Sequence, residues 1–246
     1  MGEKKISEVR PYNDSREKKI QVEEMFDNIA PQYDRLNQIL SLGIHRSWRK
    51  KAVQLLTESR PNRILDLATG TGDFAIELAR NGSSEITASD ISEGMMEIGR
   101  KKIVRLGLSE KIQFLRGDAE QLPFANDYFD GISIAFGVRN FQDLRKGLQE
   151  MYRVLRPGGK VVILEFSKVK GWFKPFYNFY FRFILPVIGR IFSRDASAYS
   201  YLPDSVRAFP SGDEFLSVLS ECGYHRSEAF PRTFGAATIY VACKPE

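Results

Sequence analysis

Residues 63–73 read Arg-Ile-Leu-Asp-Leu-Ala-Thr-Gly-Thr-Gly-Asp, and this stretch decides the fold. Its apolar start has the length of a strand, and the helical candidate Asp73–Arg80 follows the glycines at once. Glycine lets a backbone turn sharply and come close to a ligand. A strand, a glycine-rich loop and a helix in this order are typical of a ligand-binding βα unit.

Acidic residues around this loop favour a cationic nucleoside ligand. Asp66 precedes the glycines, and an anion there suits an ammonium and a sulfonium. Asp90 ends the next apolar run, where its carboxylate can accept hydrogen bonds from two ribose hydroxyls. Gly117-Asp118-Ala119 follows the third run and can read the amine and N1 of adenine. We therefore expect S-adenosylmethionine (SAM) as co-substrate, bound by Asp66, Gly70, Thr71, Gly72, Asp90, Asp118 and Ala119.

Two other interpretations of the loop stay open. Gly70-x-Gly72-x-x-Ala75 also matches the dinucleotide fingerprint, although Asp66 would repel a pyrophosphate. The glycines can equally form a plain turn among solvated acids.

Short apolar runs alternate with amphipathic stretches along the middle of the chain. The runs are 63–68, 85–90, 112–116, 129–135 and 160–166, and the helical candidates between them are 73–80, 95–106 and 144–155. This alternation predicts a doubly wound, Rossmann-like parallel sheet with helices on both faces. We expect one domain over 1–246, made of a helical cap (1–58), a SAM-binding core (61–166), a substrate or membrane insert after the fifth strand (167–210) and a C-terminal helix with two strands (211–246).

Several longer segments carry a family resemblance. They are Met25–Arg49, Gly117–Phe124, Ala135–Asn140, Glu150–Gly159, Leu164–Ser167 and Tyr199–Ser205. With them the chain resembles the class I SAM methyltransferases and, more narrowly, the ubiquinone/menaquinone biosynthesis C-methyltransferases. The resemblance implies a seven-stranded mixed sheet and methylation of a ring carbon of a demethylated polyprenyl quinol, with demethylmenaquinol as the expected substrate.

The sequence departs from this family in two places. Ala68 stands where the loop often has glycine, and we expect the alanine to be tolerated if its φ is negative. The segment 233–244 matches only loosely, which leaves the specificity for the quinone tail open.

A ring carbon is a poor nucleophile, and it improves when a neighbouring ring hydroxyl ionises. Because an unperturbed phenol has a pKa of about 10, the enzyme has to help this ionisation. Arg139 follows the fourth run and is always charged, so we expect it to lower the pKa of the phenol. Asn140 can orient the same oxygen, and His45 can accept a proton because an unperturbed imidazole has a near-neutral pKa. In the alternative interpretation Arg139 pairs with a surface acid, Asn140 caps the helix 144–155 and His45 is a hydrogen-bonded structural residue.

Other side chains have less specific roles. We expect Asp27, Tyr33 and Asp34 on a lid, Glu165 in the pocket or in a buried pair, Tyr199 and Tyr201 in the quinone pocket or the core, and Trp48 in the core.

The positive charge of the chain is concentrated in one aromatic segment. The net charge is +5, and residues 166–194 carry six Lys and Arg without any Asp or Glu: Lys168, Lys170, Lys174, Arg182, Arg190 and Arg194. Nine aromatic residues lie between Trp172 and Phe192. Aromatic and basic residues together suit a membrane interface or an isoprenoid tail. Packing against the sheet, a homodimer contact and single-stranded nucleic acid are the alternatives.

Composition narrows the class of protein. The two cysteines, Cys222 and Cys243, form no C-x-x-C motif, and His45 lies far from His225, so we expect no metal. We expect no signal peptide and no spanning helix, and therefore a cytoplasmic protein bound peripherally to the inner face of the membrane. A nucleic-acid methyltransferase usually has Asn/Asp-Pro-Pro-aromatic where this chain has Ala135-Phe136-Gly137-Val138, so nucleic acid is not the expected partner. Another small-molecule methyltransferase, or a silent SAM-binding membrane protein, stays open.

Overall fold

One mixed sheet of seven strands forms the centre of the computed structural model, which describes residues 6–82, 84–169, 171–180, 183 and 197–246, without the side chain of Tyr199. The strand order is β3-β2-β1-β4-β5-β7-β6, which confirms the expected doubly wound sheet. The strands are β1 (Arg63–Leu67), β2 (Glu85–Asp90), β3 (Ile112–Arg116), β4 (Phe129–Ala135), β5 (Leu155–Phe166), β6 (His225–Arg232) and β7 (Ala237–Cys243). β1 to β5 are parallel, and β7 runs antiparallel to both of its neighbours.

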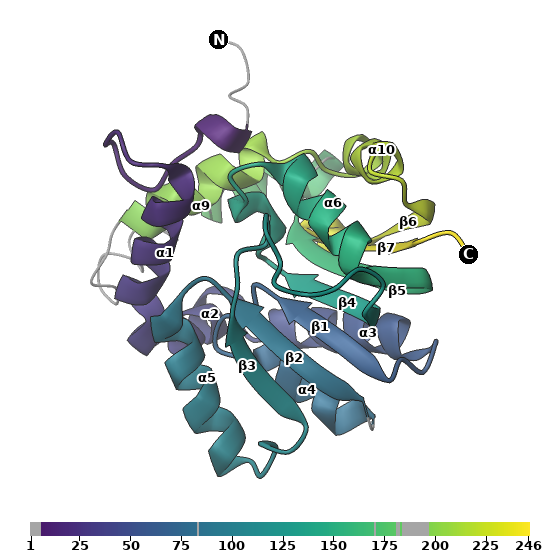
Figure 1. Cartoon of the computed structure of the whole chain (residues 1–246). Coiled ribbons are helices and arrows are strands. Elements are labelled where there is room, and N and C mark those ends of the chain that lie inside the picture. Colours follow the sequence, from purple (N-terminus) through teal and green to yellow (C-terminus); the bar gives the residue numbers. More distant parts are fainter. Residues whose placement is uncertain (1–5, 83, 170, 181–182, 184–196) are drawn as a thin grey trace.

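Helices cover both faces of the sheet, as Figure 1 shows. Residues along β1 alternate between the two apolar cores: Ile64 faces one and Leu65 faces the other. On one face lie α6 (Leu144–Val154) and α10 (Asp213–Glu221), and on the opposite face lie α3 (Ile44–Thr57), α4 (Asp73–Asn81) and α5 (Glu93–Arg105). The helical stretches expected in the core begin and end within two residues of these bounds.

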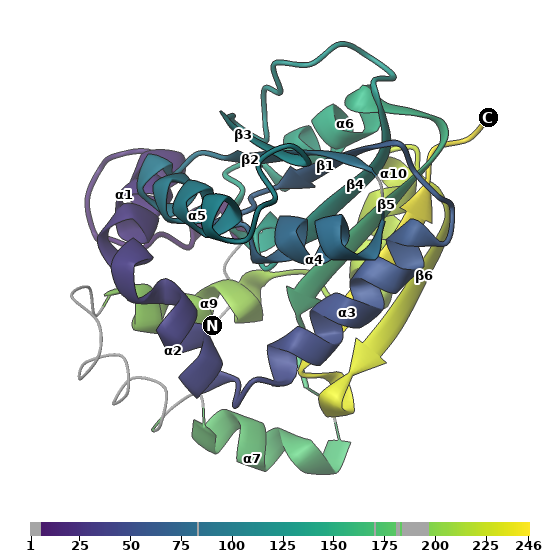
Figure 2. The ribbon, with the colours of Figure 1, turned by 90° about the horizontal axis from the view of Figure 1, so that it is seen from below.

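The remaining helices gather at the carboxyl ends of the parallel strands (Figure 2). They are α1 (Lys18–Ile29), α2 (Tyr33–Leu40), α7 (Lys174–Phe179) and α9 (Ser197–Ala208). Val22, Met25 and Ile29 of α1 share a core cluster with Met95 of α5 and Tyr201 of α9. The N-terminal cap and the insert after β5 therefore meet, although they are far apart in the sequence. Lys170, Arg182, Arg190, Arg194 and Phe192 of the predicted basic insert lie outside the described residues.

The sheet order places ligands at one point. It reverses between β1 and β4, and open α/β sheets bind ligands beyond the carboxyl ends of the strands at such a switch point. The loop after β1 and the short helix η3 (Val138–Asn140) after β4 flank this point.

Candidate active site

The loop after β1 has three residues in the left-handed region. Gly70 and Gly72 have φ of 56° and 78°, which glycine adopts without strain. Ala68 has φ of 50°, so the negative φ under which an alanine is tolerated without strain is not met. A Cβ on Gly137 would come within 2.5 Å of the Ala68 Cβ, so the glycine after β4 leaves room for this alanine. The loop therefore keeps its ligand-binding shape at the cost of some strain.

A first cavity opens beyond this loop. Of the predicted cofactor residues, Gly70, Asp90, Asp118 and Ala119 line it, together with Asn140. Asp90 is buried and accepts hydrogen bonds from the backbone N–H of Gly70 at 2.7 Å and of Ser92 at 2.9 Å. Burial raises the pKa of Asp90 to about 6. Each carboxylate oxygen keeps a second acceptor position for a ligand hydroxyl.

Asp118 is held in a similar way from two sides. Its Oδ1 accepts a hydrogen bond from the backbone N–H of Glu120 at 2.9 Å, and its Oδ2 forms an ion pair with Lys19 Nζ at 2.7 Å. Lys19 also lines the first cavity, and the sequence analysis did not single it out. Nothing in its sequence neighbourhood distinguishes Lys19 from the adjacent lysine, because the contact joins α1 to the loop after β3.

Asp66 and Thr71 border a different space from Asp90 and Asp118. Asp66 is fully buried and accepts hydrogen bonds from Thr69 Oγ1 at 2.5 Å and Ser133 Oγ at 2.7 Å. Burial raises the pKa of Asp66 to about 6. Asp66 and Thr71 line a second cavity, Gly70 lines both cavities, and Gly72 is among the lining residues of neither.

The predicted lid residues do contact the loops of the first cavity. Asp27 on α1 accepts hydrogen bonds from Ser92 Oγ at 2.5 Å and the Gly94 N–H at 3.0 Å. Asp34 on α2 accepts one from Thr71 Oγ1 at 2.5 Å. These bonds fasten the N-terminal cap over the carboxyl ends of β1 and β2.

The second cavity is large and mainly apolar. It encloses about 1910 Å³ of space, including the part open to solvent, against about 730 Å³ for the first cavity. Its walls come from α2, α3, α7, α9 and the loops after β1, β4 and β5, with aromatic side chains that include Tyr33, Trp48, Phe136, Phe166, Phe173, Phe176, Tyr177, Tyr180 and Tyr201. Tyr33, Ala68, Gly70 and Phe136 line both cavities, so the two spaces meet beside the glycine loop.

Arg139 is the buried cation of the second cavity wall. Only 6% of it is exposed, and its Nη1 donates to Glu165 Oε1 at 2.9 Å and to the carbonyl oxygen of Phe136. Glu165 at the end of β5 is fully buried, so the alternative of a surface pair is wrong and Glu165 is a buried partner. Within the described part of the chain, the Arg139 Nε–H has no hydrogen-bond acceptor. An unpaired buried donor costs free energy, so a ligand oxygen would stabilise it.

Asn140 does not cap the following helix. That position belongs to Asp143, whose Oδ1 accepts a hydrogen bond from the Lys146 N–H at 3.1 Å. Asn140 is buried, accepts a hydrogen bond from Tyr201 Oη at 3.1 Å and donates to the Phe136 carbonyl oxygen at 3.3 Å. Its side chain therefore joins η3 to α9, at the border of the first cavity.

His45 borders the second cavity and is hydrogen-bonded to Ser41 through Nδ1. Burial, together with the cation of Arg49, lowers the pKa of His45 to about 4. The expected near-neutral pKa is therefore wrong, because the surroundings disfavour the imidazolium. His45 is a neutral and weak base at neutral pH. Trp48, one helical turn further along, is buried as expected, and its Nε1 donates to Thr233 Oγ1 at 2.9 Å.

Two joined cavities, one with carboxylates and one with aromatic walls and a guanidinium, fit what comparison with known proteins finds. A family model described as "ubiE/COQ5 methyltransferase family" matches residues 13–244. The chain belongs to this family. A protein of Bacteroides fragilis named demethylmenaquinone methyltransferase is 50% identical to it, over 96% of this chain and 97% of the relative. A Geotalea daltonii protein named ubiquinone/menaquinone biosynthesis C-methyltransferase UbiE is 49% identical, over 93% of this chain and 98% of the relative.

Solved structures support the fold. The crystal structure of the [4+2]-cyclase SpnF superposes with a TM-score of 0.66 at 19% identity, over 92% of this chain and 95% of that one. A SAM-dependent methyltransferase of Thermotoga maritima, described as a possible histamine N-methyltransferase, has a TM-score of 0.62 at 20% identity, over 90% and 98% of the two chains. One neighbour is a cyclase, so the fold alone does not define the reaction and the site has to.

Proposed function

We propose that this methyltransferase transfers a methyl group from SAM to a ring carbon of demethylmenaquinol. The observation that carries the proposal is the position of Arg139, a buried guanidinium with an unused Nε–H, in the wall of a large aromatic cavity that joins the carboxylate-lined cavity. The names of the relatives support the same substrate class.

The first cavity fits SAM by the chemistry of its donors and acceptors. Asp90 would accept the two ribose hydroxyls, because both of its oxygens keep a free acceptor position beside their backbone donors. Asp118, held by the backbone N–H of Glu120, would accept a hydrogen bond from the adenine amine. Asp66, at the boundary with the second cavity, would place negative charge near the cationic end of the ligand.

Arg139 supplies the activation that a ring carbon needs. When bound, SAM provides an electrophilic methyl group on a sulfonium. A ring oxygen at the Arg139 Nε–H would have a lowered pKa, and its ionisation spreads negative charge to the neighbouring carbon. Glu165 keeps the guanidinium in place, and Asn140 fixes η3 against Tyr201. His45 stays a candidate proton acceptor through its position, as a neutral imidazole.

Quinones extracted from cells that lack this protein test the substrate. The proposal predicts accumulation of demethylmenaquinone and its disappearance when the wild-type protein is restored. Accumulation of a demethylated benzoquinone would show a ubiquinone substrate instead, and an unchanged quinone pool would refute the role in quinone biosynthesis.

We also propose that the protein collects its substrate at a membrane surface. Within the described ranges, no helix combines the length and the apolar character that a membrane span requires. Exposed apolar side chains instead surround the second cavity: Leu42, Trp172, Phe176, Phe179 and Phe234 are all more than half exposed. Figure 2 shows α7, which carries two of them, lying below the N-terminal end of α3. Phe234 packs on Trp172 with ring centroids 5.3 Å apart, so the turn between β6 and β7 joins the same surface.

This surface, which we call the aromatic rim, would insert between lipid headgroups while Lys168 and Lys174 attract anionic lipid. Leu42 and Phe176 also line the second cavity, so the cavity opens within the rim and a quinol dissolved in lipid can enter directly. A homodimer contact through the same surface is the competing occupant.

Tryptophan fluorescence tests the aromatic rim. The chain has two tryptophans. Trp48 is 7% and Trp172 69% exposed, so Trp172 reports on the surface. We expect the emission of Trp172 to shift to shorter wavelength when anionic vesicles are added. The double variant Phe179→Ser, Phe234→Ser should bind the vesicles roughly tenfold more weakly. Lys168→Glu with Lys174→Glu should weaken it at low salt only. No binding to any vesicle, with a dimer in solution that these variants dissociate, would favour the homodimer.

A further inference from the structure

Lys18 is a buried lysine that the reaction as described does not use. Only 1% of it is exposed, although it is the first residue of α1 and follows a strongly polar segment. Its Nζ donates hydrogen bonds to three backbone carbonyl oxygens: Ile6 at 2.8 Å, Arg139 at 3.2 Å and Phe141 at 3.0 Å. Burying an ammonium costs several kcal/mol unless such partners offset it, so the arrangement asks for a reason.

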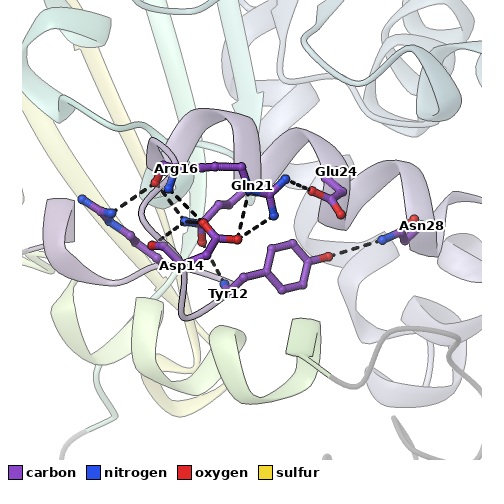
Figure 3. Close-up of polar contacts among 7 residues, drawn as sticks. Tyr12, Asp14, Arg16, Gln21, Glu24 and Asn28 are labelled. Atoms are coloured by element: carbon purple, nitrogen blue, oxygen red, sulfur yellow. Dashed lines mark hydrogen bonds and ion pairs between the residues drawn. The ribbon is translucent and has the colours of Figure 1, made fainter.

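The chain before α1 is folded so that Lys18 points inward. Figure 3 shows the contacts of this segment with α1. Gln21, fully buried, accepts a hydrogen bond from the Tyr12 N–H at 2.9 Å and donates to Asp14 Oδ1 at 2.8 Å and to the Arg16 carbonyl oxygen at 2.9 Å. These bonds fix the start of α1 and, with it, the direction of the Lys18 side chain.

Two of the three carbonyls that Lys18 holds, those of Arg139 and Phe141, belong to the segment between the two cavities. Arg139 lines the second cavity, whereas Asn140 and Phe141 line the first. On its other side the segment is held by Glu120, whose Oε1 accepts hydrogen bonds from the backbone N–H of Gln142 at 2.8 Å and Asp143 at 2.9 Å. A cation thus fixes the carbonyls of this segment, and an anion fixes its N–H groups.

We propose that Lys18 is a positioning residue for methyl transfer: by clamping the carbonyls of Arg139 and Phe141 to the N-terminal cap, it sets where the Arg139 guanidinium stands relative to the bound cofactor. The inference rests on the proposed function, because it assigns Arg139 to the reacting oxygen. It makes closure of the cap a condition for an aligned site, since α1 carries both the clamp and cavity residues such as Phe26. A displacement of about 1 Å in such a site can lower the rate roughly a hundredfold.

The protonation of Lys18 provides a second readout. Burial, together with the neighbouring Arg139 cation and against the opposing effect of Glu120, lowers the pKa of Lys18 to about 7. The ammonium is therefore lost as the pH rises through this value. A neutral amine has two N–H donors for three carbonyl oxygens, so the clamp weakens above neutral pH.

Kinetics with demethylmenaquinol, together with calorimetric SAM binding, test the clamp. For Lys18→Met we expect kcat to fall roughly ten- to hundredfold while SAM affinity stays within about threefold. Lys18→Arg, which keeps the charge and the donors, should recover part of the rate. The matched control is Lys101→Met, because Lys101 is exposed on α5 and pairs only with Glu97 among the contacts described for it; its kinetics should equal the wild type.

The outcomes separate this inference from the proposed function. A folded, SAM-binding Lys18→Met enzyme with wild-type kcat would overturn the clamp while the function stands. A wild-type enzyme that leaves demethylmenaquinol unmethylated would overturn the function first. If Lys18→Met does not fold, Lys18→Arg carries the test: we expect the kcat of the wild type to decline above pH 7 and that of Lys18→Arg to lack this decline, and identical pH profiles would refute the clamp.

Discussion

The two cavities are built in different ways. The two carboxylates singled out in the first cavity stand at or just after strand ends: Asp90 is the last residue of β2, and Asp118 lies two residues after β3. The walls of the second cavity come from helices and loops between Met25 and Ala236, including α2, α7 and α9. The carboxylates of the first cavity are therefore placed by local βα units, whereas the aromatic walls of the second cavity depend on long-range packing of the cap and the insert.

The two cavities also differ in the charged side chains that line them. The first presents the carboxylates of Asp90 and Asp118, which suit a hydroxylated and cationic ligand. The second presents aromatic rings and the guanidinium of Arg139, which suit an apolar ring with a developing negative charge, and the Asp66 carboxylate beside the glycine loop. Variants in one cavity should therefore change binding of the cofactor, and variants in the other should change the rate.

Removal of the guanidinium should give the largest effect. Arg139→Gln combined with Glu165→Gln removes the cation without leaving its buried partner charged, which would cost about 3–5 kcal/mol of stability. We expect kcat to fall roughly 10²–10³-fold, as it does when one donor to a developing anion is lost, with SAM affinity nearly unchanged. Steady-state kinetics and calorimetry measure both quantities.

The control for this variant is Arg145→Gln, because Arg145 forms an exposed pair with Glu221 and should not matter. If SAM binding collapses while the rate at saturation stays normal, Arg139 acts in cofactor binding and the comparison of the two cavities is wrong.

Asp90 should show the opposite behaviour. Its carboxylate would accept hydrogen bonds from the ribose, each worth about 1.5–3 kcal/mol. Asp90→Ala should weaken SAM roughly ten- to hundredfold, and kcat at saturating SAM should change much less. Calorimetry that shows unchanged affinity would remove Asp90 from the site, and new affinity for NADH would revive the dinucleotide interpretation.

The pH dependence of SAM binding should follow the two buried carboxylates. Burial raises the pKa of both Asp66 and Asp90 to about 6, so acid protonates them in the free enzyme. From pH 7 to pH 5 we expect SAM affinity to fall about tenfold for each carboxylate that must ionise. His45 stays neutral over this range because its pKa is about 4.

The same shifts act on stability with the opposite sign. A raised folded-state pKa means that these two groups favour the fold at low pH, and that this contribution is lost as the pH rises through about 6. Asp90→Asn should remove the share of Asp90 from both effects. A flat affinity between pH 5 and 7 would show that neither carboxylate must ionise for binding.

Ala68 should give the smallest effect. Its φ of 50° is strained for alanine, so Ala68→Gly should raise the unfolding free energy by about 0.5–1 kcal/mol. Gly137→Ala should destabilise, because the added Cβ would meet the Ala68 Cβ at 2.5 Å, and Ala68→Gly should partly rescue it. Thermal unfolding measures all three variants, and simple additivity of the two changes would contradict the contact.

Much of the fold, and the placement of the carboxylates in the first cavity, could be predicted from the sequence. The runs ending at Asp90, Arg116 and Ala135 coincide with β2, β3 and β4, because apolar runs between turn residues are local signals. Asp90 and Asp118 could be placed for the same reason: Asp90 ends β2 and Asp118 follows β3, and the sheet fixes both strand ends.

The surroundings of the second cavity depend on contacts that no local sequence pattern encodes. The pairing of Arg139 with Glu165 joins β5 to the loop after β4, and burial of His45 lowers a pKa that the sequence suggested was neutral. Lys18 looks like one more charged residue in a polar segment, and only the folded chain places it under Arg139. Ala68 shows that local structure is also not fully predictable, because the loop imposes a φ on this alanine that the residue itself does not favour.

The position of the transferred methyl group tests the central claim most directly. Purified protein is incubated with demethylmenaquinol and SAM carrying a ¹³C-labelled methyl group, and the product is analysed by NMR. The account predicts a label on a ring carbon, with a yield that falls sharply in the Arg139→Gln, Glu165→Gln variant. A label on a ring oxygen, or no transfer to the quinol by an enzyme that binds SAM, would contradict it.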